Sequence, residues 1–447
     1  MTGSVRRFLS SGSILIAGTA AYFVVGFAQN VMLARSLGTA GFGAWAIVAA
    51  SWFLLHALFT QGAEEALLRE LAAERDSSDR RRLRDTLAGG VRVAVLTRLV
   101  CAVLLVLGSF TLARFTDQPE AIAWAMRIQA LTAVVDAVEP FWRCIMRDRE
   151  RFVAIAAQPV LSVLAVLSLL TVLALAGVLT VPLVAACALT MSLGRAVVCL
   201  AMLRRELRSH YQVSGLATRA LVVWRYPLAV PATYWQSVRL GLLSNFFAGA
   251  TRHGDVLILM WFVGDTQLGL YRIARMMIEY AVQAVRLLGI AAFGDMTRMA
   301  QEGRLDDLVR FLRTSSLVMG GLALAAAPVL LLLTDDILVL FYGAAYAEAE
   351  LPMQILVPSL LLFMTLFWTN ELVYALRQLT FYTAMMATLL VVFVAVGWGL
   401  SHTYGIVGMA ITSSATAATA TVLTFLRLAL WLRAERKRQI GALSEPR

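Results

Sequence analysis

Long apolar stretches recur along almost the whole chain, separated by short charged or Gly/Pro-rich breaks. Each stretch holds about 20 residues or more, enough for a helix rising about 1.5 Å per residue to cross about 30 Å of hydrocarbon. The pattern predicts twelve membrane spans, near 12–34, 42–66, 90–113, 120–142, 153–177, 180–202, 238–262, 267–292, 314–334, 351–374, 381–400 and 406–430. Unpaired backbone amides are costly in lipid, so these spans should be helices. We therefore expect an all-α, polytopic membrane protein.

Composition excludes a soluble globular protein. Of 447 residues, 60% are hydrophobic and 15% charged, and the mean hydropathy is +0.75, whereas ordinary soluble domains carry about a quarter charged residues. The formal net charge of +11 comes almost entirely from arginine. Nearly all arginines outside the spans fall on one side of the membrane, with only Arg35 and Arg114 on the other. This bias predicts cytoplasmic termini and contact with anionic lipid head groups, not nucleic acid.

The longest polar connection falls near the middle of the chain and looks like a linker between two six-helix halves. The predicted organisation is an N-terminal lobe over 1–202, a cytoplasmic linker over 203–237, a C-terminal lobe over 238–430 and a basic cytoplasmic tail over 431–447.

An internal repeat supports two related halves. The segment LGTAGFGAW from Leu37 recurs as VGDTQLGLY from Val263, with paired glycines at the same places. In each copy the first glycine, Gly38 or Gly264, is predicted to end a helix in a conformation that carries no Cβ penalty. A weaker echo aligns Arg147 with Arg377. Generic hairpin chemistry would also explain one such match. Parallel repeats around a central cavity are typical of transporters that alternate access between two lobes.

Several stretches resemble a known family. They are NVMLARSLGTAGFGAWAIVAA from Asn30, QGAEEALLRELA from Gln61, DVLILMWFVGDTQLGLYRIARMM from Asp255 and LVLFYGAAYAEAELPMQILVPSLLL from Leu338. The first two stretches are similar to the first two helices of the polysaccharide-exporter and O-antigen flippase family. The third is similar to its seventh and eighth helices, and the fourth to its ninth-to-tenth connection. That family belongs to the multidrug/oligosaccharidyl-lipid/polysaccharide exporter (MOP) superfamily.

The resemblance implies a two-lobed, MATE-like fold in the bacterial cytoplasmic membrane and a flippase without enzymatic activity or cofactor. It implies movement of an undecaprenyl-diphosphate-linked oligosaccharide to the outer leaflet for surface polysaccharide assembly, with polymerase and export machinery as expected partners. The hydropathy pattern does not predict the extra pair of C-terminal spans that peptidoglycan-precursor flippases carry.

The candidate substrate contacts are polar residues inside the spans of the second half. Arginines in a span should face a wet cavity or a partner, and arginine grips phosphate bidentately without losing its proton. One polar stripe in span 267–292 comprises Arg272, Arg275, Glu279, Gln283 and Arg286, and span 238–262 adds Asn245, Arg252 and Asp255. Alternatively, Arg275 with Glu279 and Arg252 with Asp255 are intrahelical pairs that only hold the lobe together.

Other in-span polar residues carry weaker hypotheses. Acids that could bind a coupling proton or Na⁺ are Asp136, Glu139, Asp255 and Glu279, although pairing of Glu139 with Arg143 is the plainer interpretation. Asn30 and Asn370 could offer hydrogen bonds to sugar hydroxyls or simply pack between helices. Arg98, Arg195 and Arg239, near span ends, are expected to snorkel to the interface. The cysteines have no metal-binding or disulfide spacing.

Three rival functions remain open. A drug or metabolite antiporter of the same superfamily would need an essential membrane acid. A polymerase or ligase would need a large outer loop, which is not predicted. A non-transporting scaffold of envelope assembly would tolerate loss of the in-span arginines.

Overall fold

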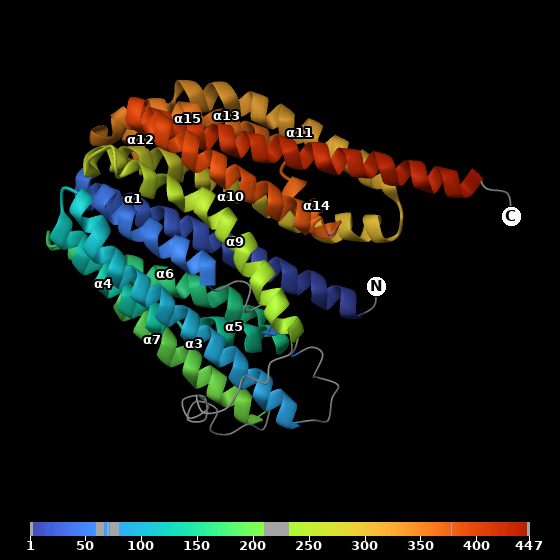
Figure 1. Ribbon diagram of the computed structural model, residues 1–447, viewed down its shortest axis with the longest axis horizontal. Coiled ribbons are helices and arrows are strands. Elements are labelled where there is room, and N and C mark those ends of the chain that lie inside the picture. Colours follow the sequence, from blue (N-terminus) through green and yellow to red (C-terminus); the bar gives the residue numbers. More distant parts are fainter. Residues whose placement is uncertain are drawn as a thin grey trace. The chain divides into compact units, whose positions relative to one another are not determined.

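We analysed a computed structural model of the chain, which describes residues 3–59, 67–68, 71, 80–209, 232–376 and 378–444. Within these residues all regular structure is helical (Figure 1). The chain divides into two compact units, Met1–Thr266 and Gln267–Arg447. Each unit is described by itself.

The first unit is a set of long helices. Its helices are α1 (Gly3–Phe59), α3 (Arg80–Thr111), η1 (Leu112–Phe115), α4 (Pro119–Val135), α5 (Val138–Asp148), α6 (Phe152–Leu175), α7 (Val181–Ser209) and α9 (Ala232–Leu259). α1 packs against α6 and α9, and α4 packs against both α3 and α7. One apolar cluster forms around Trp142 of α5, where Leu87 of α3 and Cys199 of α7 are also buried. Short α5 is thus fixed on several sides.

The second unit joins α10 (Asp265–Gln301) to the remaining helices. These are α11 (Leu305–Leu332), α12 (Thr334–Tyr342), η3 (Ala344–Ala349), α13 (Glu350–Thr365), α14 (Thr369–Ala375) and α15 (Leu379–Ser444). α13 packs against both α11 and α15, and a buried hydrogen bond of 2.9 Å joins Tyr271 Oη of α10 to Ser413 Oγ of α15. An apolar cluster around Trp368 and Leu372 holds α14 in place.

Two helices in Figure 1 contain two predicted spans each. α1 departs from helical geometry at Gly38 (φ 68°), and α15 departs from it at Gly405 (φ 56°). Both φ values lie in the left-handed region that favours glycine, so each glycine turns the chain between two crossings.

The all-α polytopic fold predicted from hydropathy is confirmed. Among the described residues, nine helical stretches are long and apolar enough to cross a membrane, including Ser13–His56 and Leu379–Arg438, which contain the turns at Gly38 and Gly405. α9 lies at the predicted span 238–262. Over the described residues, each of the twelve predicted spans therefore falls on a helix, part of one, or a helix broken in two; residues 60–66 of the span predicted at 42–66 lie outside the described residues.

The two repeat glycines serve different purposes. Gly38 has the predicted left-handed conformation, but Gly264 does not, so the prediction for the second copy is wrong. A Cβ at Gly264 would lie 2.9 Å from Asp117 Oδ2, the oxygen that also accepts the N–H of Asp265 at 2.9 Å. Gly264 thus makes room for Asp117 at the start of α10. The weaker echo involves Arg377, which lies outside the described residues.

The predicted lobe boundaries stay a prediction. The two compact units divide after α9, because α9 packs along α1. Most of the predicted linker at 203–237 lies outside the described residues. The predicted tail from 431 begins within α15, which continues to Ser444.

The α15 turn yields a stability prediction. A Cβ at Gly408 would lie 2.1 Å from the carbonyl oxygen of Leu400, so Gly408→Ala must push apart the two parts of α15 that precede and follow the turn at Gly405. We expect a loss of about 1–3 kcal/mol in the free energy of unfolding, measured in mixed micelles.

The matched control is Gly399→Ala, because a Cβ at Gly399 meets nothing within 4 Å. It should leave stability unchanged or raise it by about 0.5–1 kcal/mol. Equal stability of the two variants would contradict the close approach.

Candidate functional site

A break in the fourth predicted span positions the acids of the first unit. α4 ends at Val135 and α5 begins at Val138, with Asp136 and Ala137 between them. Pro140 explains the break, since its ring has no N–H and clashes with the carbonyl four residues earlier, which belongs to Asp136. The interruption places Asp136 and Glu139 at the junction of two helices.

The tenth predicted span is broken at the matching place. α13 ends at Thr365 and α14 begins at Thr369. The N–H and the hydroxyl of Thr369 both donate to the carbonyl of Leu366, at 3.0 and 2.8 Å, which closes a tight turn. The offset from Asp136 to Leu366 equals that from Arg147 to Arg377. Discontinuous helices at corresponding places in two halves are a feature of transporter binding sites.

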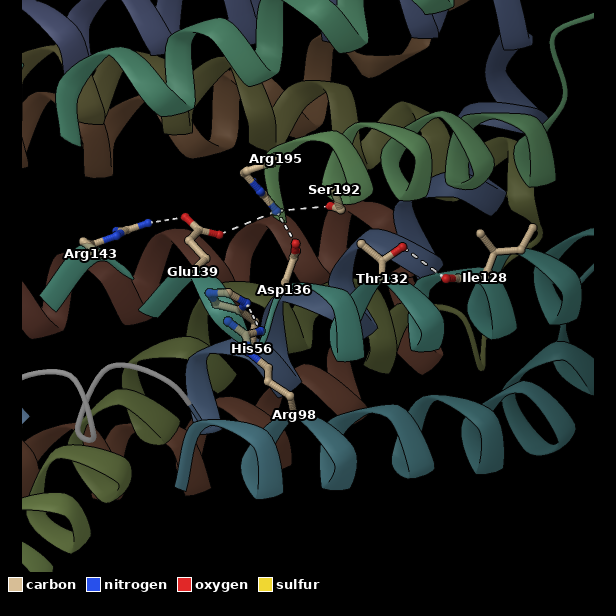
Figure 2. A network of polar contacts seen from close by, with 9 residues as sticks. All are labelled: His56, Arg98, Ile128, Thr132, Asp136, Glu139, Arg143, Ser192 and Arg195. Carbon is tan, nitrogen blue, oxygen red and sulfur yellow. Dashed lines mark hydrogen bonds and ion pairs between the residues drawn. The ribbon is translucent and has the colours of Figure 1, made fainter. Parts of the chain in front are cut away.

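The break in the first unit carries a network of charged side chains (Figure 2). Arg195 Nη2 on α7 lies 2.5 Å from Asp136 Oδ1 and 3.5 Å from Glu139 Oε2. The same Nη2 donates to Ser192 Oγ at 3.1 Å. Arg143 Nη2 lies 2.5 Å from Glu139 Oε1. The Asp136 side chain is only 6% exposed, so one guanidinium joins two carboxylates in a low-dielectric setting.

A second buried contact adjoins this network. Arg98 Nη1 on α3 lies 2.7 Å from His56 Nδ1 on α1, and Figure 2 shows the two side chains facing each other. Arg98 is 1% exposed and close enough to Asp136 to interact electrostatically with it. Because an arginine can only donate, Nδ1 of His56 must accept, which requires the proton of the neutral ring to be on Nε2. With His56 neutral, three arginines outnumber two carboxylates here.

These contacts decide between several sequence interpretations. The plainer interpretation of Glu139, an ion pair with Arg143, is confirmed as a contact. The expectation that Arg98 and Arg195 snorkel is wrong, because both side chains are held inside the unit by His56 and Asp136. The side chain of Arg239 lies outside the described residues. Ion coupling by Asp136 or Glu139 stays a prediction.

The polar stripe of α10 forms the corresponding cluster in the second unit. Glu279 lies between two arginines, with Oε2 3.2 Å from Arg272 Nη2 and Oε1 3.7 Å from Arg275 Nε. All three side chains are less than a quarter exposed. The predicted pair of Arg275 with Glu279 is therefore present, and Arg272 joins it from two turns away. Two guanidiniums share one carboxylate.

Further along α10, Arg286 Nε lies 3.6 Å from Glu371 Oε1 on α14. The Glu371 side chain is buried, and a Cβ at Gly289 would come within 2.9 Å of its Oε2. The break before α14 thus supplies a carboxylate to the α10 stripe. The sequence showed both residues in spans but no spacing that pairs them.

The remaining candidate site residues belong to neither of these two charged clusters. Asn30 Nδ2 donates to the carbonyl of Gly26 in its own helix at 2.9 Å, and Asn370 is half-buried on α14. Asp255 is fully buried on α9, and its Oδ1 accepts the N–H of Val256 at 2.8 Å, while Arg252 is exposed. The side chain of Asn245 lies outside the described residues. In the described part of the chain, no group of three or more His, Cys, Asp or Glu residues is placed to hold a metal ion.

A sequence profile described as "Polysaccharide biosynthesis protein" matches residues 8–293, more than half of the chain. The chain belongs to this family. The matched region includes the break at Asp136 and the α10 stripe through Arg286. No curated protein sequence matches the chain.

Solved structures of the MOP superfamily share the fold of this family member. An inward-facing multidrug resistance MATE family transporter has a TM-score of 0.76 at 13% identity, covering 93% of this chain and 96% of that chain. The lipid II flippase MurJ in an inward closed conformation gives 0.69 at 11% identity, with 93% and 87% covered. A MOP superfamily transporter from Pyrococcus furiosus, described as having a binding pocket of reverse polarity, gives 0.62 at 13% identity, with 96% of each chain covered.

At these identities the structural likeness establishes the fold alone. Together with the family it identifies a multi-pass membrane protein of polysaccharide biosynthesis with the transporter fold of the MOP superfamily.

The buried network predicts a stability difference between two Asp→Asn changes. Asp136→Asn removes the main partner of Arg195 and leaves that guanidinium partly uncompensated, with Glu139 still nearby. We expect a loss of about 3 kcal/mol in the free energy of unfolding, measured in mixed micelles.

Asp306→Asn is the control. It removes an ion pair with Arg436 in which both side chains are more than half exposed, so the loss should stay under about 1 kcal/mol. An Asp136→Asn protein as stable as the control would show that the network contributes little.

Proposed function

We propose that this protein flips an undecaprenyl-diphosphate-linked oligosaccharide from the inner to the outer leaflet of the bacterial cytoplasmic membrane. Two six-helix lobes with both termini in the cytoplasm would alternate access to a cavity between them. Membership of a polysaccharide biosynthesis family and the MOP fold support this proposal. Its partners would be the lipid-linked oligosaccharide, membrane lipid, and the polymerase and export machinery that use the product.

The observation that carries the proposal is the pair of arginines that α10 places together beside one carboxylate. Arg272 and Arg275 lie inside an apolar helix and share Glu279 as a common partner. A guanidinium costs on the order of 3 kcal/mol at a helix centre in lipid, so two guanidiniums kept close together in one span suggest a use for them.

A diphosphate is the ligand that such an arrangement fits. Arginine keeps its proton under all cellular conditions and presents paired N–H donors to phosphate oxygens. Glu279 would hold both guanidiniums in place while no substrate is bound. A diphosphate would then take over part of their hydrogen bonding and place its own negative charge beside them. The oligosaccharide would follow the head group, with Asn30 and Asn370 as candidate hydrogen-bonding partners.

Single substitutions at the α10 arginines test the proposal. In Arg272→Gln or Arg275→Gln, the other arginine still neutralises Glu279, so the protein should reach the membrane in normal amounts. We expect flipping to fall about tenfold or more, because a lost charge-assisted hydrogen bond is worth about 1.5–3 kcal/mol. The measurement is protection of a sugar-labelled lipid-linked oligosaccharide from a membrane-impermeant reagent in proteoliposomes.

Arg298→Gln provides the matched control on the same helix. Arg298 forms an exposed pair with Asp295, and its loss should leave flipping unchanged. Normal flipping by both test variants would refute head-group contact by these arginines. Export of small cations without flipping would favour an antiporter of the same superfamily. Full complementation by both variants in cells would favour a scaffold of envelope assembly.

We further propose that a coupling ion acts through the acids of the first unit. Arg195 Nη2 is within reach of both Asp136 and Glu139, so neutralising one carboxylate would leave the guanidinium to the other. Asp255 and Glu279 are the corresponding candidates on α9 and α10.

The coupling hypothesis predicts a gradient dependence. Collapsing the proton and Na⁺ gradients across proteoliposomes should slow flipping by the unchanged protein, and Glu139→Gln should remove that dependence. The initial rate of flipping with and without ionophores is the readout. A rate that ignores both gradients in the unchanged protein would exclude a coupling site at these acids.

A further inference from the structure

Arg127 on α4 lies apart from the charged network that its span carries. Its neighbours on the same face are Trp124 one turn before and Leu131 one turn after, each 58% exposed. The opposite face of α4 is buried, with Ile122, Met126 and Ala133 among its residues. Arg127 therefore interrupts an apolar ridge on the outside of the first unit, where the surface suits lipid chains.

Two aromatic rings hold the Arg127 guanidinium. Its Cζ lies 4.8 Å from the ring centre of Phe110 on α3 and 5.4 Å from that of Trp124. Both distances are within the range of cation–π attraction. Phe110 is 52% exposed, so the space between the two rings that holds the guanidinium is open to the outside of the unit.

One polar contact orients this guanidinium. Arg127 Nε donates to Ser109 Oγ at 3.3 Å, and the Ser109 hydroxyl itself donates to the carbonyl of Val106 at 2.6 Å. Among the described residues, no carboxylate pairs with Arg127 and no acceptor contacts its two terminal nitrogens. This differs from Arg195, Arg272 and Arg286, each of which has an acidic partner.

Arg127 lies in the N-terminal part of α4. Arg127 is eight residues after the helix start at Pro119, about 12 Å along the axis. Side chains on a helix lean toward its N-terminus, so the guanidinium lies nearer that end than its Cα does. A long arginine side chain that leans toward the end of a span can carry its charged group toward the head-group phosphates.

We propose that Arg127, with Phe110 and Trp124, forms a binding site for the phosphate of a membrane lipid at the N-terminal end of α4. The phosphate would accept the two terminal N–H groups in a bidentate contact, and the lipid chains would lie along the apolar ridge. The lipid is either bulk anionic phospholipid or the polyprenyl carrier, since both present phosphate oxygens next to hydrocarbon.

The test uses the purified full chain in detergent and its unfolding temperature. Phosphatidylglycerol should raise that temperature by several degrees more than phosphatidylcholine does. Arg127→Gln should lose most of this difference, and Arg127→Lys should keep only part of it, because an ammonium cannot make the planar, two-pronged contact. Arg114→Gln, an exposed arginine near the same end, should keep the whole difference.

Native mass spectrometry provides a second readout that does not depend on stability. Tightly bound phosphatidylglycerol should be lost from Arg127→Gln and kept by Arg114→Gln. Undecaprenyl diphosphate without sugar should displace the phospholipid at low concentration if the carrier is the natural ligand, and fail to do so if bulk lipid is. Unchanged lipid dependence in Arg127→Gln, or equal losses in both variants, would overturn the site. Either of these two results would leave the flipping predictions for the α10 arginines unchanged.

Discussion

The need to compensate positive charge in a low-dielectric interior organises both units of this protein. Hydrocarbon makes an isolated guanidinium expensive, so nearly every in-span arginine with described contacts is held by a specific neighbour. Arg98 has His56, Arg195 has Asp136, and Arg286 has Glu371. Each of these contacts joins two different helices, so the charges that lipid penalises also tie the helices together.

The carboxylates that meet this need come from the same feature in each half. Asp136 and Glu139 flank the break between α4 and α5, and Glu371 follows the break between α13 and α14. In a continuous helix, Asp136 and Glu139 would lie about one turn apart on the same face and point in nearly the same direction. The interrupted helix lets Asp136 face Arg195 on α7 while Glu139 contacts both Arg195 and Arg143 of its own helix. The functional proposal rests on α10, where Arg272 and Arg275 share Glu279.

Much of the fold followed from the sequence because hydropathy and helix geometry are local. Apolar length fixed the spans, and the three- and four-residue spacing placed Arg272, Arg275 and Glu279 on one face. The contacts that cross between helices could not be found this way. Asp136 and Arg195 are far apart in the chain and no spacing rule pairs them; only their similar depth in two spans hinted at it. The glycine at 264 was identified correctly as special but for the wrong reason, because its neighbour Asp117 comes from a distant loop.

The junction at Asp136 and Ala137 also divides one membrane crossing into two short rods. The junction separates the hydrogen bonds inside α4 from those inside α5, so a small swing of α5 relative to α4 would open none of the hydrogen bonds within either helix. Glu139 and Arg143 lie on α5, whereas Asp136 lies in the junction itself. Any swing would therefore change how Arg195 is divided between its two carboxylates, converting a mechanical movement into a redistribution of charge.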